Sequence, residues 1–213
     1  MVALVYMVAG MSSRFGGSPK SLCKVGPNQE TLLEISLNQA LIQDFSKIIL
    51  ITNPSTEYLF KQYFQTHYKE RPIYYIQQKY DKQIRTRPWG TTDAVCCLHG
   101  IIDEPFLLLN GDDLYGKKAF ETAYSNIKNH NGNIIGTIPV HKTINDDCLV
   151  NRGIVCVDQS TNKVIRLKEH LDISRESHPH LMNELSNVNF IGLQPNVVVM
   201  LNDKLSAFKK KTF

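Results

Sequence analysis

The sequence predicts an α/β protein, a Rossmann-like three-layer α/β/α sandwich with a mostly parallel central sheet and a strand-rich C-terminal portion. The first observation behind this prediction is that short apolar runs alternate with longer amphipathic stretches along residues 2–110, as in repeated βα units. The second is that residues 2–8 and 106–109 are apolar at every position, which is typical of central strands buried on both faces. The third is that strand-like segments joined by turns replace this alternation from about Gly132 onwards.

Strands and helices are expected in turn through the first part of the chain. Strands are predicted at 2–8, 47–52, 73–76 and 106–110, and helices at 31–45, 56–68 and 92–102. In the first of these helices Leu33, Leu37 and Ala40 recur at helical spacing, so one side of it should face the core. Pro27 and Asn28 are expected to mark its start.

The later part of the chain is expected to consist mainly of strands. They are predicted at 133–140, 153–158, 163–167 and 187–193, with a turn at 158–163, a loop at 170–186 and a final helix at 195–211. Neither a repeat nor a long polar linker interrupts the chain. We therefore expect a single domain over residues 1–213, with a first portion at 1–131 and a second at 132–213.

Composition disfavours several classes of protein. The formal net charge of +4 is spread along the chain apart from Lys209–Lys211, so no basic patch predicts duplex nucleic acid as a partner, whereas a small anionic ligand is compatible. The apolar run at the start is too short for a signal peptide or a membrane span, and we expect no membrane partner. The five cysteines include no CxxC pair, which indicates reduced thiols and a cytoplasmic location. None of these features predicts the oligomeric state.

The segment VAGMSSRFGGSPK, residues 8–20, follows the first predicted strand and has the composition of an anion-binding loop. In an open α/β sheet the ligand sits beyond the carboxyl ends of the strands, and the loop after the first strand commonly holds phosphates. Glycines let backbone amides turn towards an anion, serines add hydroxyl donors, and Arg14 and Lys20 supply positive charge. Two familiar patterns do not fit. A Walker loop needs lysine where Gly17 stands, and a dinucleotide fingerprint needs glycine where Ser12 stands.

A second motif, TRPWGTTDAV at residues 86–95, follows the third predicted strand. Pro88 stiffens the approach to the next helix, and Gly90 frees the backbone for close contact with a ligand. Thr91 or Thr92 is expected to cap that helix.

A third motif, FLLLNGDDLYG at residues 106–116, places Asp112 and Asp113 just past an apolar strand. A carboxylate there is costly without a cation, and Mg²⁺ usually takes one or two carboxylates plus phosphate oxygens. We expect Asp112 to be the metal ligand, and Asp113 to orient its neighbours or to cap the next helix.

In this order the three motifs resemble those of the sugar-phosphate nucleotidyltransferases, the pyrophosphorylases that make nucleotide sugars. The segment A-G-x-x-S-R-F-G-G-x-P-K resembles their first loop, P-x-G-T-x-x-A-V their nucleobase loop, and G-D their strand-end motif. Over roughly residues 2–195 the chain is similar to a group of bacterial proteins regarded as NDP-sugar pyrophosphorylases. The resemblance implies a glycosyltransferase-A-like fold, in which residues 1–131 bind the nucleotide and residues 132–213 form a shortened portion that binds the sugar phosphate.

The resemblance also implies roles for individual residues. Catalysis would rest on Arg14, on Lys20 and on Asp112 as the ligand of Mg²⁺. The residues implied in nucleotide binding are Ala9, Gly10, Met11, Ser12, Ser13, Gln78, Pro88, Gly90 and Thr91. The residues implied in binding the sugar phosphate are Asp113, Arg152, Gly153, Glu169 and Asn189. His170 departs from the family pattern, which usually has Lys or Arg after the glutamate.

The expected activity is Mg²⁺-dependent transfer of a nucleotidyl group from an NTP to a sugar 1-phosphate, which gives an NDP-sugar and pyrophosphate. Two alternatives stay open: a cytidylyltransferase acting on phosphocholine or another small phosphorylated alcohol, and a nucleotide-binding homologue without turnover. A nicotinamide-dependent oxidoreductase is disfavoured because the first loop lacks the second glycine of that fingerprint. The sequence selects neither the base nor the sugar.

Overall fold

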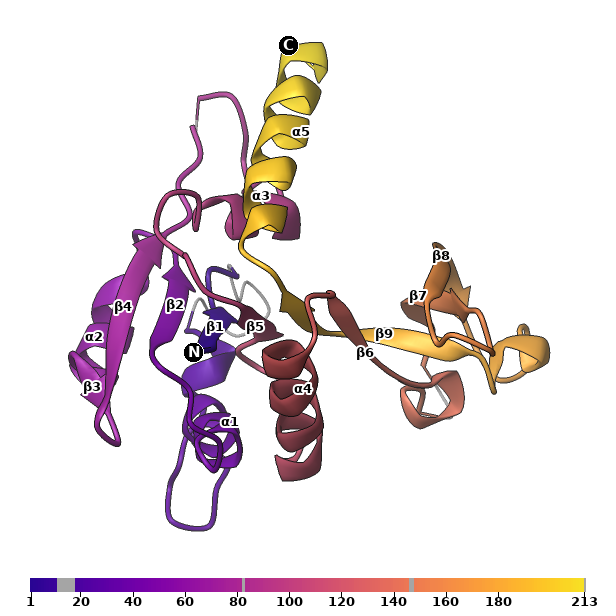
Figure 1. Cartoon of the computed structure of the whole chain (residues 1–213), viewed down its shortest axis with the longest axis horizontal. Helices are drawn as coiled ribbons and strands as arrows, with labels where there is room; N and C mark the ends of the chain where they lie inside the picture. Colours follow the sequence, from indigo (N-terminus) through magenta and orange to yellow (C-terminus); the bar gives the residue numbers. More distant parts are fainter. Residues whose placement is uncertain (11–17, 82, 146–147, 213) are drawn as a thin grey trace. The chain divides into compact units, whose positions relative to one another are not determined.

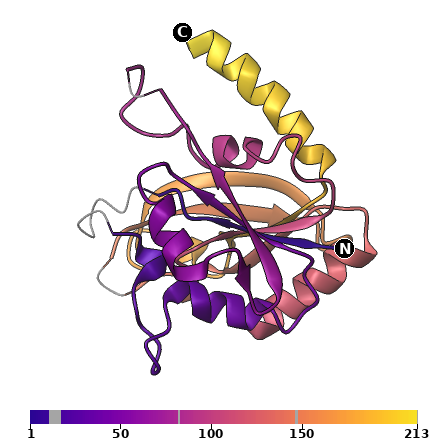
Figure 2. The same ribbon diagram turned by 90° about the vertical axis from the view of Figure 1, so that its left-hand side faces the viewer.

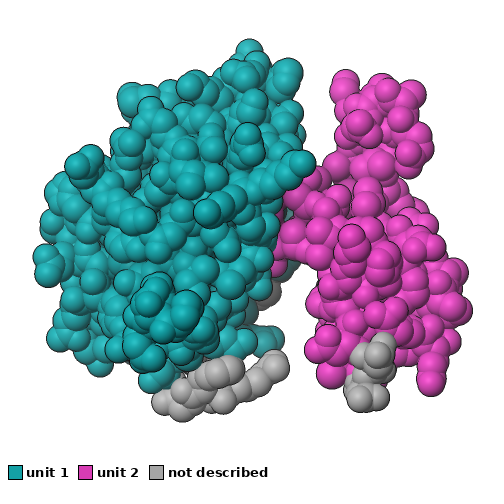
Figure 3. All heavy atoms as spheres, turned by 90° about the horizontal axis from the view of Figure 1, so that it is seen from below, with its two compact units in different colours: residues 1–134, 191–213 teal, residues 135–190 magenta. Residues whose placement is uncertain are grey.

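The computed structural model describes residues 1–10, 18–81, 83–145 and 148–212. The chain forms two compact units, Met1–Ile134 with Ile191–Phe213, and Ile135–Phe190 (Figure 3). The second and third motifs of the sequence and both described ends of the first lie in the first unit.

The first unit is organised around a sheet whose central strands are parallel (Figure 1). The strands follow the order β3 (His67–Tyr68), β4 (Arg71–Gln77), β2 (Ile48–Thr52), β1 (Ala3–Met7), β5 (Phe106–Asn110) and the end of β9 (Leu185–Leu193). Strands β4, β2, β1 and β5 pair in parallel, whereas β3 pairs antiparallel with β4 and β9 pairs antiparallel with β5. Every residue of β2 and nearly every residue of β1 and β5 is buried, as their uninterrupted apolar runs predicted.

Helices cover both faces of this sheet (Figure 2). They are α1 (Leu32–Ala40), α2 (Glu57–Phe64), α3 (Thr91–Cys96), α4 (Lys117–Asn129) and α5 (Asn196–Thr212). On one face, Val95 of α3 and Val198 of α5 join Val5 and Ile51 of the sheet in the core. On the other face, α1 packs beside α4, and the hydroxyl of Tyr6 is hydrogen-bonded to Ser36 of α1 (2.8 Å). The predicted three-layer α/β/α architecture is confirmed. In the described part of the chain, no helix has the length and apolar character needed to cross a membrane.

Helix α1 begins within one residue of the predicted range 31–45 but ends at Ala40, and its start signal differs from the one expected. Thr31 is its N-cap: the Thr31 hydroxyl accepts from the amide of Glu34 (3.1 Å), and the Glu34 carboxylate accepts from the amide of Thr31 (2.7 Å). This reciprocal pair is a capping box, whose sequence signature is Thr-x-x-Glu. The expectation that Pro27 and Asn28 mark the helix start is therefore wrong, and these residues lie in the preceding turn.

The second unit is a smaller, strand-rich body. It contains most of β6 (Ile134–Pro139), β7 (Val150–Val157), β8 (Val164–Ile173), the first part of β9, and the 3₁₀ helices η3 (Val140–Lys142) and η4 (Pro179–Leu181). Strand β7 pairs antiparallel with both β8 and β9. A separate apolar core consists of Val140, Ile144, Ile154, Ile173 and Leu181.

The turn predicted between β7 and β8 is present, whereas the loop predicted at 170–186 is wrong at its start. Asp158 holds the turn, because its Oδ1 accepts from the amides of Ser160 (2.9 Å) and Thr161 (3.0 Å). Strand β8 then continues to Ile173. The strand predicted at 163–167 is therefore confirmed but is longer than predicted, and although its side chains are mostly exposed on both faces, backbone pairing with β7 holds it in place.

Candidate active site

The segment after β1 is anchored at its start by Ile51 of β2 and by Asn53, the residue directly after β2. The amide of Val8 donates to the carbonyl of Ile51 (2.9 Å), and Nδ2 of Asn53 donates to the carbonyl of Ala9 (3.1 Å). Asn53 is buried, and its Oδ1 accepts from the amide of Thr56 (3.0 Å) next to helix α2. Asn53 therefore fixes where the loop begins. Sequence reasoning missed it, although a polar residue directly after an apolar run was an available signal.

Replacing Asn53 with alanine should lower the free energy of unfolding by about 1–3 kcal/mol, because buried partners lose their hydrogen bonds. The thermal midpoint measures this effect. A matched control is Asn126→Ala, which removes a bond from Nδ2 to Thr122 within one helix (2.8 Å). Equal midpoints for the two variants would show that Asn53 does not anchor the loop.

The first loop is described only at its two ends. Ala9 and Gly10 lie at one end, and Ser18, Pro19 and Lys20 lie at the other. Four residues with predicted roles lie outside the described residues, namely Met11, Ser12, Ser13 and Arg14. Their roles stay predictions.

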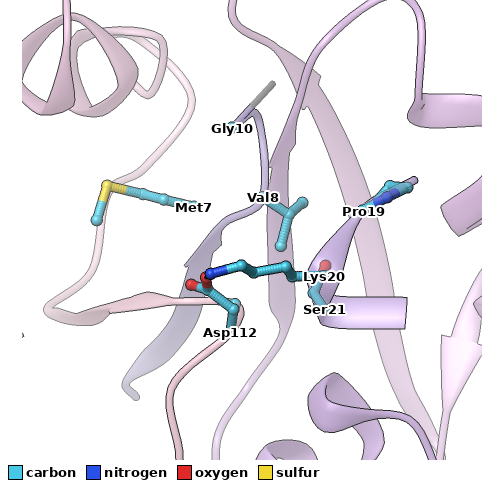
Figure 4. Close-up of a pocket in the computed structure, with 8 residues that line it drawn as sticks. Met7, Val8, Gly10, Pro19, Lys20, Ser21 and Asp112 are labelled. Atoms are coloured by element: carbon cyan, nitrogen blue, oxygen red, sulfur yellow. The ribbon is translucent and has the colours of Figure 1, made fainter. Parts of the chain in front are cut away.

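Lys20 and Asp112 face one another in a small pocket at the carboxyl ends of β1 and β5 (Figure 4). Lys20 opens the 3₁₀ helix η2 (Lys20–Leu22), Asp112 follows β5, and Nζ lies 3.7 Å from Oδ2. The pocket has a volume of about 60 Å³, and Gly10, Ser21 and Gly111 contribute to its lining. Sites that enclose a whole small molecule have roughly 300–1,000 Å³. The described part of this pocket can therefore hold a piece of a ligand, such as a phosphate group.

The pair of Lys20 and Asp112 is open to ligands. Their side chains are 44% and 41% exposed, and ion pairs at such exposure contribute little to stability. Each group can therefore exchange its partner for a phosphate oxygen or a cation at small cost. The structure brings together three residues with predicted roles here: Gly10, Lys20 and Asp112.

Gly111 allows the ends of β1 and β5 to approach one another closely. Its amide donates to the carbonyl of Met7 (3.2 Å). A Cβ at this position would overlap Cγ1 of Val8 and would stand 3.4 Å from Cβ of Ser21. Any side chain at residue 111 would force the Val8 side chain to move or would push β1 away from the turn that carries Asp112.

The predicted nucleobase loop is held by Gln78, which follows β4. Gln78 is buried, and its Nε2 donates to the carbonyl of Gly90 (3.1 Å) and to Oδ2 of Asp93 (2.9 Å). Gly90 has φ of +101° and occupies the N-cap of α3, a conformation that favours glycine. The expectation that Thr91 or Thr92 caps this helix is therefore wrong, because the helix already begins at Thr91. The half-buried Pro88 precedes the loop.

Asp113 orients its neighbours and does not cap a helix. Its Oδ2 accepts from Nδ2 of Asn110 (2.9 Å) and from the hydroxyl of Tyr115 (3.4 Å). Helix α4 has Gly116 as its N-cap, with φ of +86°. Burial, and then the charge of Asp113, raise the pKa of Tyr115, so its hydroxyl stays a donor. Of the two roles that the sequence left open for Asp113, the structure shows orientation.

Three residues predicted to bind the acceptor lie on paired strands of the second unit. Gly153 of β7 is in register with Glu169 of β8. The guanidinium of Arg152 donates to Oγ1 of Thr143 (3.0 Å), to the carbonyl of Thr143 (2.8 Å) and to that of Asn151 (2.9 Å). Arg152 therefore braces the segment before β7, while Glu169 is exposed.

Asn189, the fourth of these residues, has an unusual backbone conformation within β9. Its φ is +54°, a region that residues other than glycine rarely adopt. The side chain of Asn187 supports this conformation, since its Oδ1 accepts from the amide of Asn189 (2.9 Å) and its Nδ2 donates to Oδ1 of Asn189 (3.2 Å). Asparagine is among the residues that adopt this region most readily, and its role toward the acceptor stays a prediction.

The donor set fits a metal that takes most of its ligands from the substrate. Among the residues that the structure describes, no group of three or more His, Cys, Asp and Glu side chains could hold a metal ion. Mg²⁺ is commonly bound by one or two carboxylates plus substrate phosphates. The exposed carboxylate of Asp112 beside a phosphate-sized pocket meets that requirement.

Several solved structures share this fold. A UDP-glucose pyrophosphorylase solved with UDP-glucose has a TM-score of 0.68 and 16% identity, over 94% of this chain and 79% of that one. A UDP-glucose pyrophosphorylase from Acinetobacter baumanii has a TM-score of 0.68 and 19% identity, over 99% and 83%. The inositol-1-phosphate CTP transferase from T. maritima has a TM-score of 0.67 and 13% identity, over 93% and 72%. No curated protein matches the sequence.

The fold and the site define an enzyme that transfers nucleotidyl groups. The chain belongs to the nucleotidyl transferase family, whose sequence model matches residues 16–174, more than half of its length. The resemblance to nucleotidyltransferases that the sequence motifs indicated is thereby confirmed.

Proposed function

We propose that this enzyme joins an NTP to a sugar 1-phosphate and releases pyrophosphate, with Mg²⁺ as cofactor. The observation that carries the proposal is the pairing of Lys20 with Asp112, 3.7 Å apart, in a phosphate-sized pocket at adjacent strand ends. A lysine and a carboxylate placed together suit a ligand that brings both phosphate oxygens and a cation.

The proposed reaction needs no side chain to act as a nucleophile or a general base. An oxygen of the acceptor phosphate, already an anion at neutral pH, attacks the α-phosphorus of the NTP. The bond from that phosphorus to the β-phosphate oxygen breaks, and pyrophosphate leaves with the electron pair. Catalysis then consists of positioning the two phosphates and neutralising their charge.

The residues of the first unit supply these two functions. Lys20 would hold the acceptor phosphate or the α-phosphate, and Arg14 would stabilise the charge that develops on pyrophosphate. Asp112 would hold Mg²⁺, which lowers the repulsion between the phosphate groups when bound. The backbone of Ala9 and Gly10, and by resemblance that of residues 11–13, would cradle the triphosphate.

The base and the acceptor would bind through residues that the resemblance implies. We propose that Gln78, Pro88, Gly90 and Thr91 contact the base, and the bond from Gln78 to Gly90 supports their acting together. For the acceptor we propose Asp113, Arg152, Gly153, Glu169 and Asn189. The register between Gly153 and Glu169 supports a common role for those two residues.

The second candidate is transfer of a cytidylyl group to a small phosphorylated alcohol. The similarity in fold to the inositol-1-phosphate CTP transferase favours keeping this candidate. The two candidates use the same first unit and differ in acceptor and base.

A panel of the four NTPs against several acceptors, with pyrophosphate release as the readout, tests the proposal. The acceptors are glucose 1-phosphate, galactose 1-phosphate, inositol 1-phosphate and phosphocholine, each with and without Mg²⁺. We expect release with a sugar 1-phosphate, only when Mg²⁺ is present. Release with CTP and an alcohol phosphate alone would favour the cytidylyltransferase. Thermal stabilisation by an NTP without release in any well would identify a binding protein without turnover.

We also propose that the enzyme acts in the cytoplasm. All five cysteines are free thiols, and burial raises the pKa of Cys97 to about 11. Persistent free thiols are typical of a reducing compartment.

A further inference from the structure

The last turn of α5 lies against the loop that precedes α3, although the two are far apart in the sequence (Figure 1). Nζ of Lys209 donates to Oδ1 of Asp93 at 2.6 Å. The ring of Phe208 packs edge-on against Trp89, with centroids 6.2 Å apart. Nζ of Lys209 also lies 5.3 Å from the centroid of the Trp89 ring. All of these residues belong to the first unit.

Asp93 is the junction between this helix and the loop. Its side chain is 7% exposed, whereas that of Lys209 is 36% exposed. One carboxylate oxygen accepts from Lys209 and the other from Nε2 of Gln78, which also donates to the carbonyl of Gly90. Without Lys209, the buried carboxylate would lose its only cationic partner among the described ion pairs, which is costly for a charge at this depth.

This chain of contacts also fixes the orientation of the Gln78 amide. Its Nε2 has two acceptors, the carbonyl of Gly90 and the carboxylate of Asp93. Both protons of the amide nitrogen are therefore committed, and the amide can offer a ligand only its acceptor oxygen. If Asp93 moved or rotated, Gln78 could turn and present a donor.

We propose that Lys209 is a positioning residue for nucleotide recognition, acting through Asp93 on Gln78 and Gly90. The inference rests on the proposed function, in which Gln78 and Gly90 contact the base. It adds that the C-terminal helix sets both the affinity for the NTP and the preference among bases. Lys209 itself touches neither substrate.

The test compares Lys209→Met with Lys209→Arg and with Lys210→Met, a change at the exposed neighbouring lysine. Lys209→Met should raise the Kd and the KM for the preferred NTP about tenfold, which is the change in affinity expected when one hydrogen bond is lost. The kcat and the KM for the acceptor should stay within about twofold. The ratio of kcat/KM between the best and the second-best NTP should fall. Lys209→Arg should restore the Kd, the KM for the NTP and the kcat/KM ratio. Lys210→Met should leave these three quantities unchanged.

A double variant shows whether Lys209 acts through Asp93. In an Asp93→Asn background, Lys209→Met should raise the KM no further, because the charge that it compensates has gone. Additive effects, or a wild-type Kd in Lys209→Met, would overturn the proposal. The Kd is measured by calorimetry without an acceptor. If the wild type binds NTPs but releases no pyrophosphate, the proposed function fails while the comparison of Kd values still decides on Lys209.

Discussion

Asp112→Asn should reduce nucleotidyl transfer at least about 100-fold, the cost of losing one group that neutralises charge in the transition state. The amide is the same size as the carboxylate but is a poor ligand for Mg²⁺, so the loss should persist at high NTP concentration. Because the pair with Lys20 is exposed, the stability should change by less than about 1 kcal/mol. Initial rates of pyrophosphate release over a range of Mg²⁺ concentrations, together with thermal midpoints, measure both effects.

Asp103→Asn is the matched control for this variant. Asp103 is another exposed aspartate in an ion pair, 3.5 Å from Nζ of Lys47, but it lies at the start of β5, away from the pocket. The rate of pyrophosphate release by Asp103→Asn should equal that of the wild type. A near-normal rate in Asp112→Asn would remove this residue as the metal ligand.

Gly111→Ala should lower the free energy of unfolding by about 1–3 kcal/mol, as expected when a methyl group is forced into a packed site. The added Cβ overlaps Cγ1 of Val8, so the Val8 side chain must shift, and β1 and the Asp112 turn separate to the extent that it cannot. The rate should fall as well, because Lys20 and Asp112 would no longer face the same phosphate. Thermal midpoints and rates of pyrophosphate release check the two effects.

Two further variants give this prediction its controls. Gly132→Ala adds a methyl group where no atom lies within 4 Å, so its midpoint should match that of the wild type. Val8→Ala combined with Gly111→Ala removes the overlapping methyl group and should recover part of the lost stability. A midpoint for Gly111→Ala equal to that of Gly132→Ala would contradict the close approach of the two strand ends.

The fold was predictable where burial leaves a pattern along the chain. The apolar runs of β1, β2 and β5 are buried along their length, so composition alone marked them as central strands. Only the start of strand β8 was predicted, because its later part contains Lys168, Glu169 and His170 and its side chains are exposed on both faces. Helix α2 was predicted to continue to residue 68, but it ends at Phe64 because Gln65 adopts φ of +52°, and periodicity does not report such a reversal.

The site was predictable where its residues follow parallel strands. Lys20 and Asp112 could be expected to meet because the carboxyl ends of parallel strands share one edge of a sheet. The contact between Lys209 and Asp93 joins residues 116 positions apart, and no motif or periodicity relates them. Asn53 binds the backbone carbonyl of Ala9, and because every residue has such a carbonyl, the sequence marked the position of Asn53 but not its partner.

The position of Trp89 has a practical consequence for observing the enzyme. It is the only tryptophan of the chain, and it lies in the loop before α3, where it packs against Phe208 of the last turn of α5 and has the guanidinium carbon of Arg85 3.9 Å from its ring centroid. Intrinsic indole fluorescence therefore comes from this one junction. A change in this emission on addition of an NTP would report directly on the junction between the loop and the helix.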